Sequence, residues 1–91
     1  MTLTLLIVGK EIALILAKEG KILGQKKWTD KNDLSEKFFP QADTLLKENN
    51  YTMKDIENFL LENNIPEGYT TARIAKTIMD SLRYAREESK K

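Results

Sequence analysis

The residues with the clearest chemical potential lie in the stretch Ile65-Pro-Glu-Gly-Tyr-Thr-Thr-Ala-Arg-Ile-Ala75. Pro66 and Gly68 interrupt regular structure. A threonine at 70 or 71 can accept hydrogen bonds from the free N–H groups of a helix's first turn. A loop, a cap and a helix in this order hold a phosphate in other proteins. Arg73 could be a phosphate contact or an interaction residue, but the favoured interpretation is a solvated or salt-bridged arginine near a helix start.

The composition excludes most other active-site chemistry. The chain has no cysteine and no histidine, which removes disulfides, thiolate nucleophiles, the commonest metal ligand and the usual acid–base group of neutral pH. Asp33 and Glu36 are carboxylates that could pair as acid and base. Because they precede an apolar helical pattern, the favoured interpretation is that they are first-turn charges of a helix.

Length and charge indicate one small domain without the features of a nucleic-acid binder or a membrane protein. Fifteen basic and fourteen acidic residues among 91 give a net charge of +1, so the chain lacks the excess of basic residues that is typical of nucleic-acid-binding proteins. A chain of this length buries only about 60–65% of its unfolded surface, and a partner could contribute to its stability. Met1 to Val8 is apolar but lacks the features of a signal peptide, and no stretch approaches the roughly 20 apolar residues of a membrane span. We therefore expect a cytoplasmic protein with no membrane contact.

Residues 2–28 predict a three-stranded antiparallel meander. The runs 2–8, 11–17 and 22–28 are rich in β-branched residues and leucine, and short candidate turns separate them. Parallel neighbours would need a crossover of about a dozen residues or more, so these strands must be antiparallel. The first two runs are apolar on both faces, as in strands that are covered on both sides. The third carries Lys26 and Lys27, which suit an edge because lysines hinder pairing with another strand.

Two long helices and a short strand complete the pattern. Residues 34–50 carry an apolar helical stripe, and Pro40 within it requires a helix that either begins near Phe39 or is kinked. Thr52-Met-Lys-Asp55 resembles a capping box, and residues 57–61 predict a strand that returns beside the first one. Residues 70–88 have the i, i+3, i+4 spacing of an amphipathic helix. The order βββαβα makes residues 1–91 a single α+β domain.

Four segments, in the right order, resemble the bacterial TsaB family, also called YeaZ. The family has Gly-Pro-Gly-Ser-Phe-Thr-Gly-Leu-Arg-Ile-Gly where this chain has residues 65–75, so that Pro66, Thr70, Arg73 and Ile74 match and Tyr69 replaces the Phe, beside Gly68. The other segments are Asp33-Leu-Ser-Glu-Lys-Phe-Phe-Pro40, similar to Asp-His-Ser-Glu-Lys-Leu-Leu-Pro, Met53-Lys-Asp-Ile56, similar to Leu-Lys-Asp-Ile, and the turn Lys18-Glu-Gly-Lys21 with Ile22-Leu23.

The resemblance implies a fold and a role. The fold is the opening half of the ribonuclease-H-like lobe of the actin-like ATPase superfamily, here shortened to the first lobe. The role is that of a non-catalytic partner subunit in the synthesis of threonylcarbamoyladenosine on tRNA, and the expected partner is the large catalytic threonylcarbamoyl-transferase subunit, a second copy, or both.

Departures from the family pattern argue against ATP binding. The family's first turn carries Asp-Thr-Ser, whereas this chain has Val8-Gly-Lys-Glu11, and the family's His falls on Leu34. Glu67, Thr71 and Ala75 replace glycines of the family motif, and Glu67 adds negative charge where a phosphate needs backbone donors. The superfamily also holds its nucleotide between two lobes. We therefore expect no cofactor, no metal and no catalysis, with a residual nucleotide site at Thr70 as the alternative.

In the family the two helices also form the docking surface for the catalytic subunit or for a second copy. The residues predicted on the outer sides of the helices are Phe38, Ala42, Leu45, Ala72, Lys76 and Met79. On this assignment Met79→Asp abolishes pairing and leaves the monomer folded. Trp28 is either an interface anchor or an edge residue over the sheet. If both helices pack on one face, the other apolar face stays open, which is typical of an interaction site.

The leading functional hypothesis is therefore a shortened TsaB-like scaffold for the tRNA-modification machinery. The alternative is a degenerate stand-alone homodimer without a role in tRNA modification. Capture of the large subunit distinguishes the two hypotheses.

Overall fold

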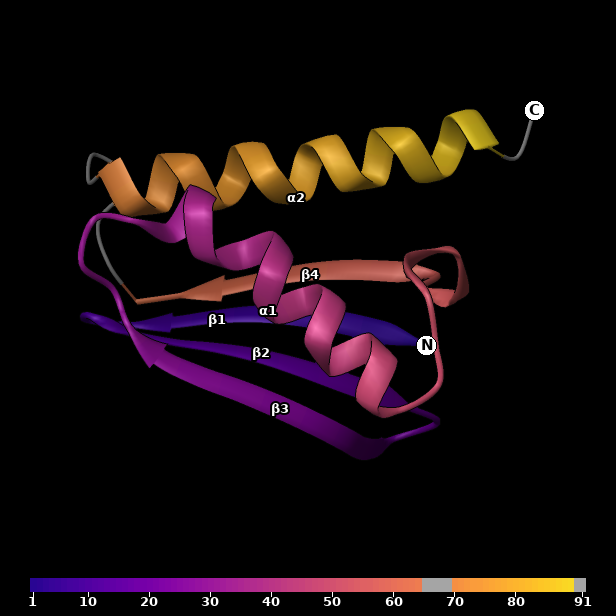
Figure 1. The fold of residues 1–91 in the computed structure, drawn as a ribbon. Coiled ribbons are helices and arrows are strands. Elements are labelled where there is room, and N and C mark those ends of the chain that lie inside the picture. The colour runs from indigo at the N-terminus through magenta and orange to yellow at the C-terminus, as the bar shows by residue number, and fades with distance from the viewer. Residues whose placement is uncertain (65–69, 90–91) are drawn as a thin grey trace.

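The computed structural model describes residues 1–64 and 70–89. Its elements are β1 (Thr2–Val8), β2 (Glu11–Lys18), β3 (Lys21–Thr29), α1 (Leu34–Glu48), a 3₁₀ turn η1 (Met53–Asp55), β4 (Asn58–Asn63) and α2 (Thr70–Ser89). The predicted order βββαβα and the α+β class are confirmed (Figure 1).

The strands form one four-stranded sheet in the order β3-β2-β1-β4. β1 pairs with β2, and β2 with β3, in antiparallel fashion, so the predicted meander is confirmed. β4 returns as a parallel neighbour of β1, with Leu3 opposite Phe59 and Leu5 opposite Leu61. The sheet therefore ends at β3 on one side and at β4 on the other.

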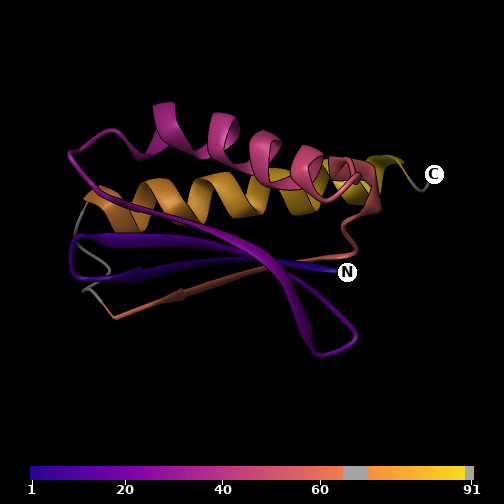
Figure 2. The ribbon, with the colours of Figure 1, turned by 60° about the horizontal axis from the view of Figure 1, so that its bottom comes forward.

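Both helices cover the same face of the sheet, as Figure 2 shows most clearly. The side chains of Leu3, Leu5 and Ile7 are buried on that face, opposite Leu16, Leu14 and Ile12 of β2. Because side chains alternate across a strand, the residues between them lie on the other face. The molecule thus has two layers, and its core lies between the sheet and the helices.

α1 begins before Pro40, and its first turn is anchored by Asp33. The Asp33 carbonyl accepts hydrogen bonds from the backbone N–H groups of Glu36 and Lys37, each at 3.0 Å. The possibility that the helix begins near Phe39 is therefore wrong, since Pro40 lies inside the helix. An internal proline lacks the N–H that would bond to the preceding turn, and the core packing of α1 offsets that loss.

The predicted capping box at Thr52 is present ahead of β4. The Asp55 carboxylate accepts the Thr52 backbone N–H at 2.8 Å. Further along, Arg83 of α2 donates from Nε and Nη2 to the Phe59 carbonyl at 2.9 and 2.6 Å. Together these bonds fix the crossover from α1 to β4 and hold α2 along the edge strand.

α1 packs tightly against β3 at Gly24. A Cβ atom placed there would lie 3.0 Å from Leu45 Cδ1 and 3.0 Å from Asn49 Nδ2. Lys26, also on β3, holds the end of α1 through an ion pair between Nζ and Glu48 Oε1 at 2.7 Å. The missing side chain at position 24 thus lets the helix approach the sheet.

Gly24→Val is expected to lower the free energy of unfolding by about 1–3 kcal/mol, because the branched side chain overpacks this contact. Urea unfolding measures the change. Gln25→Val is the matched control, since Gln25 is exposed and faces away from the helices on the same strand. Equal effects of the two substitutions would mean that strand propensity, and not the α1 contact, determines the result.

Candidate interaction surface

The start of α2 holds the residues that first suggested a phosphate site. Pro66, Gly68 and Tyr69 lie outside the described residues. Thr70 and Arg73 are exposed in the first turns of α2. We find no ion pair between Arg73 and the part of the chain that the structure describes, which agrees with the interpretation of a solvated arginine.

Thr71 connects this helix start to the loop before α1. Its hydroxyl donates to Asp30 Oδ2 at 2.7 Å. The other oxygen, Asp30 Oδ1, accepts the backbone N–H groups of Asn32 and Asp33 at 3.0 and 3.3 Å. The Thr71 hydroxyl is thus used within the protein to fix α2 against the 30–33 loop.

The carboxylates Asp33 and Glu36 lie at the N-terminal end of α1. Asp33 Oδ1 accepts the Lys31 backbone N–H at 3.2 Å, and Glu36 lies in the exposed first turn. This is the arrangement expected of first-turn charges near a helix N-terminus. Within residues 1–64 and 70–89, no group of three or more acidic, histidine or cysteine side chains is placed to hold a metal ion. No described helix is long and apolar enough to cross a membrane.

The prediction that six residues lie on the outer sides of the helices needs correction. The side chains of Phe38, Ala42, Leu45, Ala72 and Met79 are buried in the core beneath the helices, and of the six only Lys76 is exposed. The physical reason is that each helix has one apolar stripe, and in a two-layer fold this stripe must cover the sheet. A partner therefore cannot contact these five side chains while the domain is folded.

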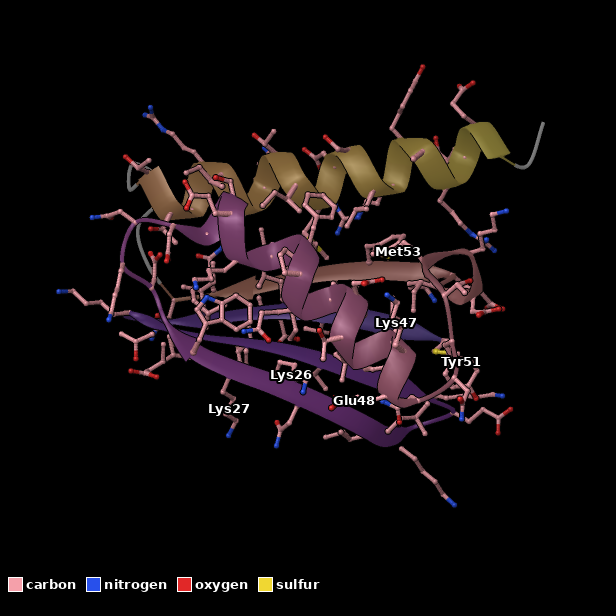
Figure 3. All side chains as sticks on the ribbon, in the orientation of Figure 1. Lys26, Lys27, Lys47, Glu48, Tyr51 and Met53 are labelled. Atoms are coloured by element: carbon pink, nitrogen blue, oxygen red, sulfur yellow. The ribbon has the colours of Figure 1, made fainter. Side chains whose placement is uncertain are left out.

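The exposed apolar surface of the helix layer lies at the margin of the apolar stripe of α1. Phe39 is 49% exposed, and its ring packs edge-on against buried Phe38 with centroids 5.1 Å apart. It lines a groove of about 470 Å³ that continues over α1 to the segment before β4. The groove is lined by Phe39, Pro40, Asp43, Leu46, Lys47, Tyr51, Thr52 and Met53. Figure 3 shows the labelled Lys47, Tyr51 and Met53 at this end of α1.

A second hollow, of about 340 Å³, lies between the first turns of α1 and α2. Its lining is Ser35, Arg73, Ile74, Thr77 and Ile78. Sequence analysis missed Phe39 as a surface residue. At 100° per residue Phe39 lies about 90° from the centre of the stripe, so a helical projection could have found it. Tyr51 follows the helix and carries no such signal.

Trp28 belongs to the core margin. Its side chain is partly buried and packs against the core cluster on the helix-covered face. This placement favours the edge-strand interpretation over that of an interface anchor. The surface formed by the helix layer is thus apolar around Phe39, and the hollow beside Arg73 is lined by both polar and apolar side chains.

No family model and no curated protein matches this sequence. Among solved structures, YeaZ from Pseudomonas aeruginosa superimposes with a TM-score of 0.76 over 96% of this chain, at 19% sequence identity. The fold is that of one portion of YeaZ. A second solved structure, an uncharacterized protein with similarity to peptidase YeaZ from the same organism, gives the same TM-score, identity and coverage of this chain.

The match to YeaZ covers only part of that protein. The chain spans 41% of the first YeaZ chain and 40% of the second. The fold implied by the sequence resemblance is therefore confirmed for one portion of YeaZ. An identity of 19% establishes this fold, and any shared activity or partner is a separate matter.

Proposed function

We propose that this chain is a non-catalytic, TsaB-like partner subunit that binds the threonylcarbamoyl-transferase subunit of the tRNA-modification machinery. Binding takes place through the exposed surface of α1 and α2. The observation that carries the proposal is the YeaZ fold together with the sequence segments that resemble the TsaB family. The absence of cysteine and histidine from the sequence argues for a scaffolding role.

The contact surface in this proposal is centred on Phe39. A half-exposed aromatic ring beside an apolar groove suits an interface anchor, because aromatic residues carry much of the binding energy at protein interfaces. Buried Phe38 holds the ring from one side, so little side-chain freedom is lost on binding. The chain would act by binding the active conformation of the larger subunit more tightly than its other conformations.

The test is light scattering and calorimetric titration of the purified chain with the transferase subunit from the same source. A stable complex is expected, and Phe39→Asp should weaken it by about tenfold or more, equivalent to about 1.4 kcal/mol. Ile22→Asp is the matched control, because Ile22 is an exposed apolar residue on the opposite side of the molecule. It should leave the affinity for the transferase subunit unchanged.

Absence of a complex, or equal sensitivity to both substitutions, would overturn the proposed docking mode. A chain that forms a homodimer and ignores the transferase subunit would support the alternative, a stand-alone interaction protein without a tRNA-modification role. Binding of ATP with magnesium at the start of α2 would contradict the non-catalytic assignment.

A further inference from the structure

The face of the sheet away from the helices is uncovered by any described element (Figure 2), and apolar side chains occupy part of it. Val8, Ile22 and Leu60 expose 48%, 65% and 46% of their surface there. Leu6, Ala13, Ile15 and Ala17 complete the apolar centre of this face, as the strand registers place them on the same side. Contiguous apolar surface of this kind marks an interaction site.

One row of side chains crosses all four strands and has a distinctive order. The registers pair Lys27 with Ala13, Ala13 with Leu6, and Leu6 with Glu62. From β3 to β4, the side chains of this row are therefore basic (Lys27), small (Ala13), large (Leu6) and acidic (Glu62). A hollow of about 250 Å³ lies over the small residue, lined by Leu6, Val8, Glu11, Ile12, Ala13 and Lys27.

The two charges at the ends of this row are not used within the monomer. Lys27 and Glu62 are both exposed, and neither forms an ion pair with a described residue. Three strand spacings separate them, about 14 Å, which is too far for a direct contact. An external partner with the reverse order of charges would neutralise both ends.

We propose that this face packs against the same face of a second copy of the chain. The two-fold axis runs parallel to the strands, between β1 and β2, and reverses the row. Lys27 then faces Glu62 of the second copy, and Leu6 faces Ala13 of the second copy, so that opposite charges meet and each large side chain lies over a small one. The hollow over Ala13 receives the leucine of the opposing sheet.

Two-fold symmetry makes both ends of the row equivalent. Each dimer contains two Lys27–Glu62 contacts and two Leu6–Ala13 contacts, because the same patch serves both copies. A small inclination of this axis to the strands gives the angle of about 30° that is found between aligned, packed sheets.

The size of the face predicts a weak dimer. A sheet of four strands with about seven residues each covers about 19 by 23 Å. Its projected area is therefore about 450 Å², without the additional surface of protruding side chains. Stable interfaces bury about 800 Å² per partner, so this face falls below the standard size and within the range of weak, transient interfaces. We expect a dissociation constant on the order of 10 μM.

This association is independent of the proposed function, because it uses the opposite side of the molecule. Failure of one does not imply failure of the other. Phe39→Asp addresses the helix layer, and charge reversal at Lys27 or Glu62 addresses the open face. A homodimer formed through the helices would respond to the first and not to the second.

The test is sedimentation of the 91-residue chain over concentrations that bracket the expected dissociation constant. Lys27→Glu and Glu62→Lys should each weaken dimerisation by about tenfold, since each reverses two symmetric contacts. An equimolar mixture of the two variants should associate as tightly as the parent, because every contact then joins opposite charges again. The double variant Lys27→Glu, Glu62→Lys should also be restored.

Lys37→Glu and Glu36→Lys are the matched controls. They change the net charge by the same amounts at exposed positions of α1, on the other side of the sheet. They should leave the dimer unchanged. A monomer at all concentrations, a failure of the mixture to associate, or equal weakening by the α1 controls would overturn the proposal, and so would loss of the dimer with Phe39→Asp alone.

Discussion

Met79→Asp is expected to unfold the monomer. The Met79 side chain is 0% exposed and belongs to the core cluster beneath α2. A carboxylate placed there has no partner of opposite charge, and burying an unpaired charge costs several kcal/mol. A domain of this size has a total stability of about 5–14 kcal/mol, so the substitution removes much or all of it.

The effect of Met79→Asp should depend on pH with a defined sign. Burial raises the pKa of the introduced carboxyl group above its value in the unfolded chain. The native state therefore binds the proton more tightly, and the variant loses stability as pH rises above the ordinary range of an aspartate. Urea unfolding followed by circular dichroism, near pH 4 and near pH 7, should find the larger loss at the higher pH.

Lys76→Asp is the matched control for Met79→Asp. Lys76 is exposed on the same helix, less than one turn earlier, and the substitution introduces the same carboxylate into water. Its effect on stability should stay within about 0.5 kcal/mol. A folded Met79→Asp protein that had lost only its association with a partner would support the sequence-based interface assignment and contradict the burial of Met79.

The strands of the sheet could be predicted from the sequence, but the face of the sheet that meets the helices could not. Runs rich in β-branched residues and leucine, separated by short turns, define the meander, and Glu19 and Gly20 adopt the positive φ values, 52° and 81°, that a tight hairpin favours. Both faces of β1 and β2 are apolar, so the pattern cannot say which one meets the helices. The register decides it, by stacking Leu3, Leu5 and Ile7 beside the apolar residues of β2 and β4.

The helices illustrate the opposite case. Their apolar stripes are clear in the sequence, but the family resemblance predicts the centre of each stripe at the interface. In a two-layer protein the centre of the stripe covers the sheet, and a partner can reach only its margin. Phe39 is such a residue on α1, and Ile74 and Leu82 lie partly exposed at the margin on α2.

The contacts that fix the start of α2 could not be predicted from local spacing. Thr71 and Asp30 are 41 positions apart, and their hydrogen bond depends on how both helices lie over the sheet. The same holds for Gly24, whose role follows from the approach of Leu45 and Asn49. Sequence patterns define elements, whereas such contacts depend on packing between elements that are distant in the chain.

Phe38→Ala and Phe39→Ala form the most direct test of the orientation of α1. The two residues are adjacent and identical in chemistry, but Phe38 is 0% exposed and Phe39 is 49% exposed. Truncation of a buried phenylalanine leaves a cavity and costs about 3–5 kcal/mol. Phe39→Ala loses only the edge-on ring contact and part of its apolar area, so a cost of about 0.5–1.5 kcal/mol is expected.

The two substitutions also distinguish an effect on the stability of the domain from an effect on partner binding. Phe38→Ala should lower the urea midpoint strongly, and any loss of partner binding should follow the fraction of unfolded protein. Phe39→Ala should lower the urea midpoint much less than Phe38→Ala does, and it should weaken the complex with the transferase subunit at concentrations where the domain is fully folded. Equal destabilisation by both substitutions would mean that Phe39 packs in the core and that α1 is rotated relative to the orientation described above.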